Sequence, residues 1–126
     1  MTKIVSIAAV ILGVMMVVFG LNKLVPFLPM PAPTPEEMKI FTALLTLGWV
    51  LPLVATIEIV GGVLLVFPRT RALGAIVLLP VMTGIVLHHV VHAPATLLMP
   101  LILFAIDIAV ILMNTRKYLP MISKLN

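Results

Sequence analysis

The fold is decided by the first long apolar stretch, Ile4 to Val25, which reads IVSIAAVILGVMMVVFGLNKLV. A helix of roughly 20 apolar residues is long enough to cross a bilayer, and this stretch has that length. Its apolar part is longer than that of a secretory signal peptide, and no Ala-x-Ala cleavage site follows it. We therefore expect a retained membrane-spanning helix at the start of the chain.

The composition extends this expectation to the whole chain. Its 126 residues are 63% hydrophobic and 10% charged, whereas about a quarter of the residues of a soluble domain are charged. Four spans need about 80 apolar residues, which is close to what the chain holds. We predict an all-α polytopic membrane protein with one domain, residues 1–126, forming a four-transmembrane-helix bundle. The expected spans are residues 4–25, 50–67, 72–91 and 95–113.

The charged residues exclude several classes of protein and set the expected orientation. With a net charge of only +4 and no cysteine, neither a nucleic-acid partner nor thiol chemistry is expected. The positive-inside rule places both termini in the cytoplasm, and the protein in the inner membrane if its source is a bacterium. The basic residues on the cytoplasmic side are Lys3, Arg69, Arg71, Arg116, Lys117 and Lys124, against Lys23 and Lys39 outside.

The first outer connection is rich in proline. Prolines alternate through it, and they exclude both a helix and a central strand. Thr34 before Pro35, with Glu37 three positions after the threonine, is typical of a helix that begins with a capping box. A new helix is therefore expected to begin at Pro35.

A straight helix over residues 35–67 would be about 50 Å long at about 1.5 Å per residue. The hydrocarbon core of a bilayer is only about 30 Å thick. We therefore expect an outer amphipathic segment at about 35–47, a kink at Gly48 or Pro52, and then the second span.

Ionisable side chains inside the spans form the candidate functional site, because charged groups within a bilayer are energetically costly and usually mark a functional site. A helical rise of about 1.5 Å per residue from the cytoplasmic basic residues places Glu58 and Asp107 near the midplane, and Lys23 roughly 14 Å further out than Glu58. At that separation we expect a water molecule or a ligand between Lys23 and Glu58 rather than direct contact. The candidate polar or ligand-binding residues are Lys23, Asn22, Glu58, His88 and Asp107.

Small residues lie near both carboxyls, and they permit a second helix to approach. They are Gly61 and Gly62 for Glu58, and Ala105 and Ala109 for Asp107. Both carboxyls are thus expected to face the interior, where they cannot both ionise cheaply. One should be protonated and hydrogen-bonded to the other, or to Thr83 or Asn22. Such a pair is either a proton-accepting or ligand-orienting site, or a polar clasp that fixes helix register; the sequence leaves both open.

His88 and His92 are four residues apart and so share a helix face. This spacing makes them candidate metal ligands, with Glu36 or Glu37 reaching in from the outer segment. No carboxylate lies at a fixed motif offset, so we expect solvated histidines and no bound metal.

Three segments together resemble the DoxX-like family of small membrane proteins. Residues 19–24, FGLNKL, resemble the Gly-x-x-Lys-Leu ending of the family's first span, and residues 58–65, EIVGGVLL, its Glu-x-x-Gly-Gly-x-Leu-Leu second span. Residues 69–75, RTRALGA, are similar to its short basic turn into the third span. The resemblance implies a four-helix membrane bundle in which Lys23 and Glu58 are the family-like polar positions.

By the same resemblance, some members are subunits of quinone-linked oxidation systems, others act near redox-stress complexes, and animal relatives serve as assembly chaperones. Three functions are therefore open: an accessory subunit of a membrane redox system that holds a quinone or lipid, a non-catalytic assembly subunit, and a proton or solute conduit. The expected partners are the bilayer and other membrane subunits or further copies of the chain. No nucleophile–base set or nucleotide-binding motif is present, and whether the protein is an enzyme stays open.

Overall fold

A computed structural model describes residues 2–122, and this part of the chain is helical and contains no strand. Lys124, assigned above to the cytoplasmic side, lies outside the described residues. The all-α fold class is thus confirmed. The helices are α1 (Lys3–Leu24), α2 (Pro35–Leu47), α3 (Val50–Val66), α4 (Arg71–His92), α5 (Leu98–Leu112) and α6 (Thr115–Tyr118), with short 3-10 turns at Pro94–Thr96 and Leu119–Met121.

Two of these helices, α1 and α4, are each 22 residues long and apolar enough to cross a membrane by themselves. The number rises to four if each of two bent pairs is one span: α2 with α3, bent by 92°, and α5 with the α6 segment, bent by 68°. The bounds of α1, α3 and α4 agree with three of the expected ranges to within one residue at each end, while their crossing of a bilayer stays a prediction. The exception is α5, which begins three residues late because residues 94–96 form a 3-10 turn.

The predicted break before the second span is confirmed, and Gly48 makes it. Thr34 Oγ1 accepts a hydrogen bond from the Glu37 amide at 3.2 Å, and Glu37 Oε2 accepts one from the Thr34 amide at 3.4 Å, so α2 begins with the expected capping box. It ends at Gly48, whose φ of +78° is a left-handed conformation that glycine adopts without strain. Pro52 lies in the first turn of α3, where proline is tolerated.

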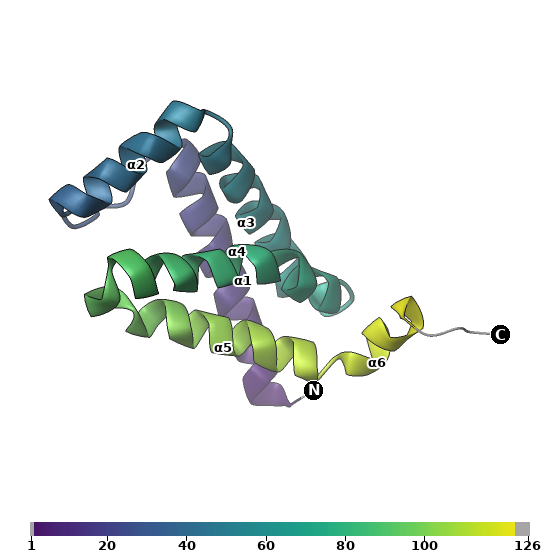
Figure 1. Cartoon of the computed structure of the whole chain (residues 1–126). Helices are drawn as coiled ribbons and strands as arrows, with labels where there is room; N and C mark the ends of the chain where they lie inside the picture. The colour runs from purple at the N-terminus through teal and green to yellow at the C-terminus, as the bar shows by residue number, and fades with distance from the viewer. Residues whose placement is uncertain (1, 123–126) are drawn as a thin grey trace.

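The four long helices pack in a closed order. α1 packs most extensively on α3, α3 on α4, α4 on α5, and α1 also contacts α5. Figure 1 shows α4 and α5 side by side, with both crossing α1 steeply. The N-terminus, the α3–α4 turn and α6 gather at one end, whereas α2 and the α4–α5 connection lie away from it. The chain therefore collects most of its basic residues at one end.

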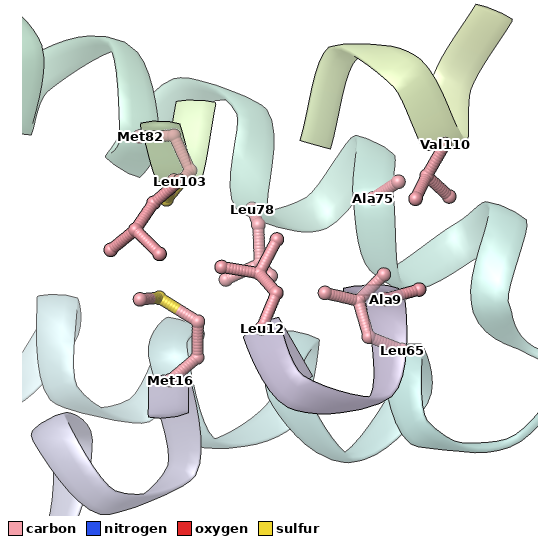
Figure 2. Close-up of a cluster of buried hydrophobic side chains, with 9 residues drawn as sticks. All are labelled: Ala9, Leu12, Met16, Leu65, Ala75, Leu78, Met82, Leu103 and Val110. Carbon is pink, nitrogen blue, oxygen red and sulfur yellow. The ribbon is translucent and has the colours of Figure 1, made fainter. Parts of the chain in front are cut away.

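The core lies where α1, α3, α4 and α5 meet (Figure 2). Met16, Met82 and Leu103 lie at one end of the cluster, and Leu12 faces Leu78 in the middle. Ala9, Leu65, Ala75 and Val110 lie at the other end. All nine side chains are at least nine-tenths buried, so this cluster fixes the relative positions of the four helices.

The turn between α3 and α4 is held by side chains that bond to the open carbonyls at the end of α3. Arg71 is 5% exposed, and its guanidinium donates from Nε to the Leu65 carbonyl at 2.9 Å and from Nη2 to the Val66 carbonyl at 3.0 Å. Thr70 donates to the Leu64 carbonyl at 2.8 Å. The last carbonyls of a helix have no partner within it, so these bonds stabilise the tight turn.

Candidate functional site

Glycines bring α1 and α3 into backbone contact. A Cβ atom added to Gly13 would lie 2.6 Å from the Gly62 carbonyl oxygen, and one added to Gly62 would lie 2.5 Å from the Gly13 carbonyl oxygen. One added to Gly20 would lie 2.8 Å from the Ala55 carbonyl oxygen. Because Gly13 faces Gly62 and Gly20 faces Ala55, the two helices run antiparallel. The predicted role of Gly62 in close packing is confirmed, and Gly61 lets the side chain of Leu78 of α4 pack directly against α3.

This close approach creates an ion pair between Lys23 of α1 and Glu58 of α3. Lys23 Nζ lies 2.9 Å from Oε1 and 3.0 Å from Oε2 of Glu58, and the contact to Oε2 has hydrogen-bond geometry. The Glu58 side chain is 1% exposed and that of Lys23 is 32% exposed. A fully buried carboxylate is thus neutralised by a cation that still reaches the surface of the protein.

The prediction of a water molecule or ligand between these two groups is wrong, because the side chains touch. The expected separation of roughly 14 Å assumed straight helices along the membrane normal. The structure differs in two ways. Helical side chains point back toward the N-terminus of their helix, so Lys23 reaches from the end of α1 toward its middle. Gly20, one turn before Lys23, lies against Glu58 itself, with a virtual Cβ 3.2 Å from the Glu58 Cβ.

Asp107 is the second buried carboxyl, and its surroundings are different. It is 0% exposed, and neither of its oxygens has a hydrogen-bond partner among the described residues. Leu103 and Val110, one turn away on either side, are buried on the same face of α5 and belong to the hydrophobic core. The expected inward face is correct, but its cause is not the flanking alanines, because Ala105 is exposed.

The predicted hydrogen-bonded pair of Glu58 and Asp107 is wrong for this structure. Glu58 bonds to Lys23 instead. The other proposed donors are also committed elsewhere: the Thr83 hydroxyl donates to the Leu79 carbonyl at 2.8 Å, and Asn22 bonds to the outer loop. Asp107 lies in the second half of α5, the half that leads into α6 at the other end of the molecule.

The remaining candidates lie at the outer end without joining the ion pair. Asn22 Oδ1 accepts hydrogen bonds from the amides of Phe27 and Leu28, both at 2.9 Å, and so organises the start of the proline-rich loop. The His88 ring packs on the neighbouring rings of His89 and His92, with centroids 5.3 Å and 5.5 Å away. In the described part of the chain, no hydrogen bond or ion pair links either residue to Glu58.

His92 and Glu36, which the sequence offered as candidate metal ligands, are in direct contact with each other. His92 Nδ1 lies 2.9 Å from Glu36 Oε1, and their side chains are 36% and 60% exposed. Within residues 2–122 there is no group of three or more side chains that could hold a metal ion. The contact therefore ties α2 to the end of α4.

Sequence reasoning missed two features that shape the site. Gly13 and Gly20 were not recognised as the surface on which α3 packs, although small residues seven apart on an apolar helix are a sign of close approach. Arg71 was assigned only to membrane orientation, although a basic residue just after a helix end is suited to bond its last carbonyls.

Comparison with known protein families gives a match. The model of the family described as DoxX matches residues 4–93, well over half of the chain. This range contains Lys23, Glu58 and the histidines, and it ends before Asp107. No curated protein and no solved structure gives a significant match.

Proposed function

The chain belongs to the DoxX family of membrane proteins, and we propose that it serves as a small accessory subunit of a quinone-linked membrane redox system. The contact between Lys23 and Glu58 is the single observation that carries this proposal. Ionisable groups inside a membrane protein are rare and usually functional, and this pair lies in helices that are mostly apolar.

The proposed arrangement in the membrane is a bundle of four spans with both termini in the cytoplasm. α3 has 17 residues, the lower end of the range that spans a bilayer. α5 has only 15, so the fourth span needs the preceding 3-10 turn at Pro94–Thr96 or a locally thinned bilayer to complete it. The 92° bend at Gly48 would then lay α2 along the outer surface. Apolar residues Met38, Phe41 and Leu45 follow one face of α2 and are exposed, as in an interfacial helix.

The ion pair fits a quinone because Lys23 keeps a donor to spare. An ammonium group has three N–H donors, and two oxygens of Glu58 take at most two of them. The third can donate to a carbonyl oxygen of a quinone head group that enters from the lipid side, where Lys23 is 32% exposed. Glu58 holds the ammonium in place, and the apolar outer surfaces of α1 and α3 suit contact with the ring and tail.

Binding of decylubiquinone to the purified protein in detergent tests this proposal. The single tryptophan, Trp49, lies at the start of α3 and provides a fluorescence signal that a quinone quenches. We expect Lys23→Met/Glu58→Leu to lose saturable quenching, because the donor is gone while the site remains apolar and neutral. Lys39→Met removes another lysine from the outer end and should leave binding unchanged. Equal binding by the double variant and the parent would refute the quinone site.

Topology has a separate test, since the chain has no cysteine of its own. With both termini in the cytoplasm, Pro33→Cys should react with a membrane-impermeant maleimide in intact cells, whereas Arg69→Cys should react only after the cells are opened. Reaction of Arg69→Cys in intact cells would contradict the proposed orientation.

An assembly or interaction subunit is the second candidate, and α2 is the observation that favours it. None of its 13 residues is buried, so this helix leaves an apolar stripe available to another membrane protein. If a partner binds there, Phe41→Glu should release a subunit that co-purifies stoichiometrically with the parent. Retention of that subunit would exclude α2 as the contact.

A proton conduit through Glu58 and Asp107 receives no support from the geometry. The two groups are not linked by any hydrogen bond in the described part of the chain. We therefore do not include it in the proposed function.

A further inference from the structure

A hollow lined by basic side chains lies at the end of the molecule opposite the Lys23–Glu58 pair. The positive-inside rule accounts for basic residues at this end, but not for their gathering around one hollow. A cavity of about 540 Å³ lies between the start of α1, the α3–α4 turn and α6. Its cationic lining residues are Arg71, Arg116 and Lys117, and the hydroxyl residues Ser6 and Thr115 lie beside them. Side chains from three distant parts of the sequence therefore surround one space.

The position of α6 brings these cations close together. The α6 segment bends by 68° from α5 and so turns across the end of the bundle. Tyr118 then fastens α6 to α4, because its hydroxyl donates to the Ala72 carbonyl at 2.6 Å. Arg116 and Lys117, two residues and one residue before Tyr118, are thereby held beside Arg71.

Arg71 supplies a buried and oriented guanidinium at the base of the hollow. It is 5% exposed, and two of its five N–H donors bond to the Leu65 and Val66 carbonyls. The other three donors have no partner among residues 2–122 and can bind a ligand. A planar guanidinium held in this way is well suited to bind phosphate oxygens through two parallel hydrogen bonds.

No side-chain carboxylate of the chain is available to neutralise this cluster. The chain has four acidic residues in total. Glu58 pairs with Lys23, Glu36 contacts His92, and Glu37 caps α2. The fourth, Asp107, is fully buried in the core. None of the four side-chain carboxylates is free for this cluster, so we expect the matching anion to come from another molecule.

A second hollow of about 460 Å³ adjoins the first and is mostly apolar. The two share Ser6, Pro68 and Arg71. From there the second hollow runs along α1 past Ile7 and Ile11, each 54% exposed. A basic space that opens into an apolar groove is complementary to an amphiphile with an anionic head.

We propose that the two hollows bind an anionic glycerophospholipid, with its phosphate held by Arg71, Arg116 and Lys117 and one acyl chain along α1. Free phosphate offers the same charge, but it would leave the groove beside Ile7 and Ile11 unused. Cytoplasmic leaflets are rich in anionic lipid, and basic pockets between helices at that surface are suited to bind it. The site is independent of the quinone site, because it lies at the opposite end of the molecule and shares no residue with it.

Native mass spectrometry of the detergent-solubilised protein with phosphatidylglycerol or phosphatidylcholine of the same acyl chains tests this site. We expect the parent to prefer phosphatidylglycerol by at least tenfold. Each exposed basic residue near a membrane surface contributes about 1 kcal/mol, which is about fivefold in affinity. Arg116→Gln and Lys117→Gln should each weaken phosphatidylglycerol binding about fivefold, and the double variant about 25-fold.

Arg69→Gln is the matched control, because Arg69 lies in the same turn and is exposed but lines neither hollow. It should change the affinity less than twofold. An equal loss in Arg69→Gln would show a general effect of charge and overturn the site, as would equal binding of the two lipids. Displacement of phosphatidylglycerol by millimolar inorganic phosphate would show that the hollow binds phosphate alone and would overturn the lipid assignment.

Discussion

Glu58 and Asp107 are two carboxyls buried to the same extent, but their surroundings differ. Both are 0% exposed. Glu58 lies within 3.0 Å of Lys23 through both of its oxygens, whereas neither oxygen of Asp107 has a hydrogen-bond partner among the described residues. Glu58 lies between helices that touch through glycine backbones, and Asp107 lies between Leu103 and Val110 in the core.

The difference shows that burial does not by itself define a polar site. A buried carboxylate is tolerated when a cation offsets the loss of hydration, and α1 supplies that cation to Glu58. Among the described residues no such cation contacts Asp107, so we expect it to be accommodated as a neutral acid. One region of the molecule thus carries a charged pair, and the other carries a single polar group in an apolar setting.

Lys23→Met should have the largest effect on stability. It leaves the fully buried Glu58 carboxylate without its cation, and breaking a buried pair from one side costs about 3 to 5 kcal/mol. The unfolding free energy of the detergent-solubilised protein, measured by titration with SDS, checks this loss.

The double variant Lys23→Met/Glu58→Leu is the control for that measurement. It replaces the whole pair by apolar side chains and should recover most of the loss, because such replacements are often neutral. If the double variant were as unstable as Lys23→Met, the lysine would stabilise the protein through packing. Charge pairing would then not be what distinguishes Glu58 from Asp107.

Glu58→Gln and Asp107→Asn provide the direct comparison, because each replaces an acid by an amide of the same shape. Glu58→Gln removes a hydrogen bond between charged groups and should cost about 1.5 to 3 kcal/mol. Its cost stays below that of Lys23→Met because Lys23, 32% exposed, can turn to water. Asp107→Asn removes no such bond and should change the unfolding free energy by less than about 1 kcal/mol. Equal losses of unfolding free energy in the two variants would show that Glu58 and Asp107 make equivalent contributions to stability.

Much of the fold followed from patterns that depend on local sequence. The apolar runs predicted α1 and α4, and Thr34, Pro35 and Glu37 predicted the start of α2, because capping depends on residues within one helical turn. Gly48 was one of two expected positions for the bend. Such features need no knowledge of which helices become neighbours.

The candidate site was harder to predict because it depends on helix register. Lys23 and Glu58 were both identified, but an estimate of depth along separate straight helices placed them too far apart. The contact depends on the packing of Gly20 against α3 beside Glu58. The relative register of α1 and α3 cannot be predicted from a single sequence. Asp107 was paired with Glu58 for the same reason: depth was considered, and the face of each neighbouring helix was not.

Two helical glycines test whether the α1–α3 contact positions the ion pair. A Cβ atom in Gly62→Ala would lie 2.5 Å from the Gly13 carbonyl oxygen, so the helices must separate, at about 1 to 3 kcal/mol for overpacking. Gly84→Ala is the matched control, because a Cβ there meets nothing within 4 Å. It should stabilise α4 by about 0.5 to 1 kcal/mol. If Gly62→Ala were as harmless as Gly84→Ala, close backbone contact would not be what sets the register.

The smallest effect, and the sharpest test of the comparison, is the coupling between Glu58 and Asp107. Groups that share no partner have additive effects on stability, within about 0.3 to 0.5 kcal/mol. The sum of the losses in Glu58→Gln and Asp107→Asn should therefore equal the loss in the double variant within that range. A shared proton or a direct hydrogen bond would instead give a coupling of about 0.5 to 3 kcal/mol, because either single change would already break the common interaction. A coupling of that size would show that the two carboxyls form one site in the membrane, and the assignment of Glu58 to Lys23 alone would have to be abandoned.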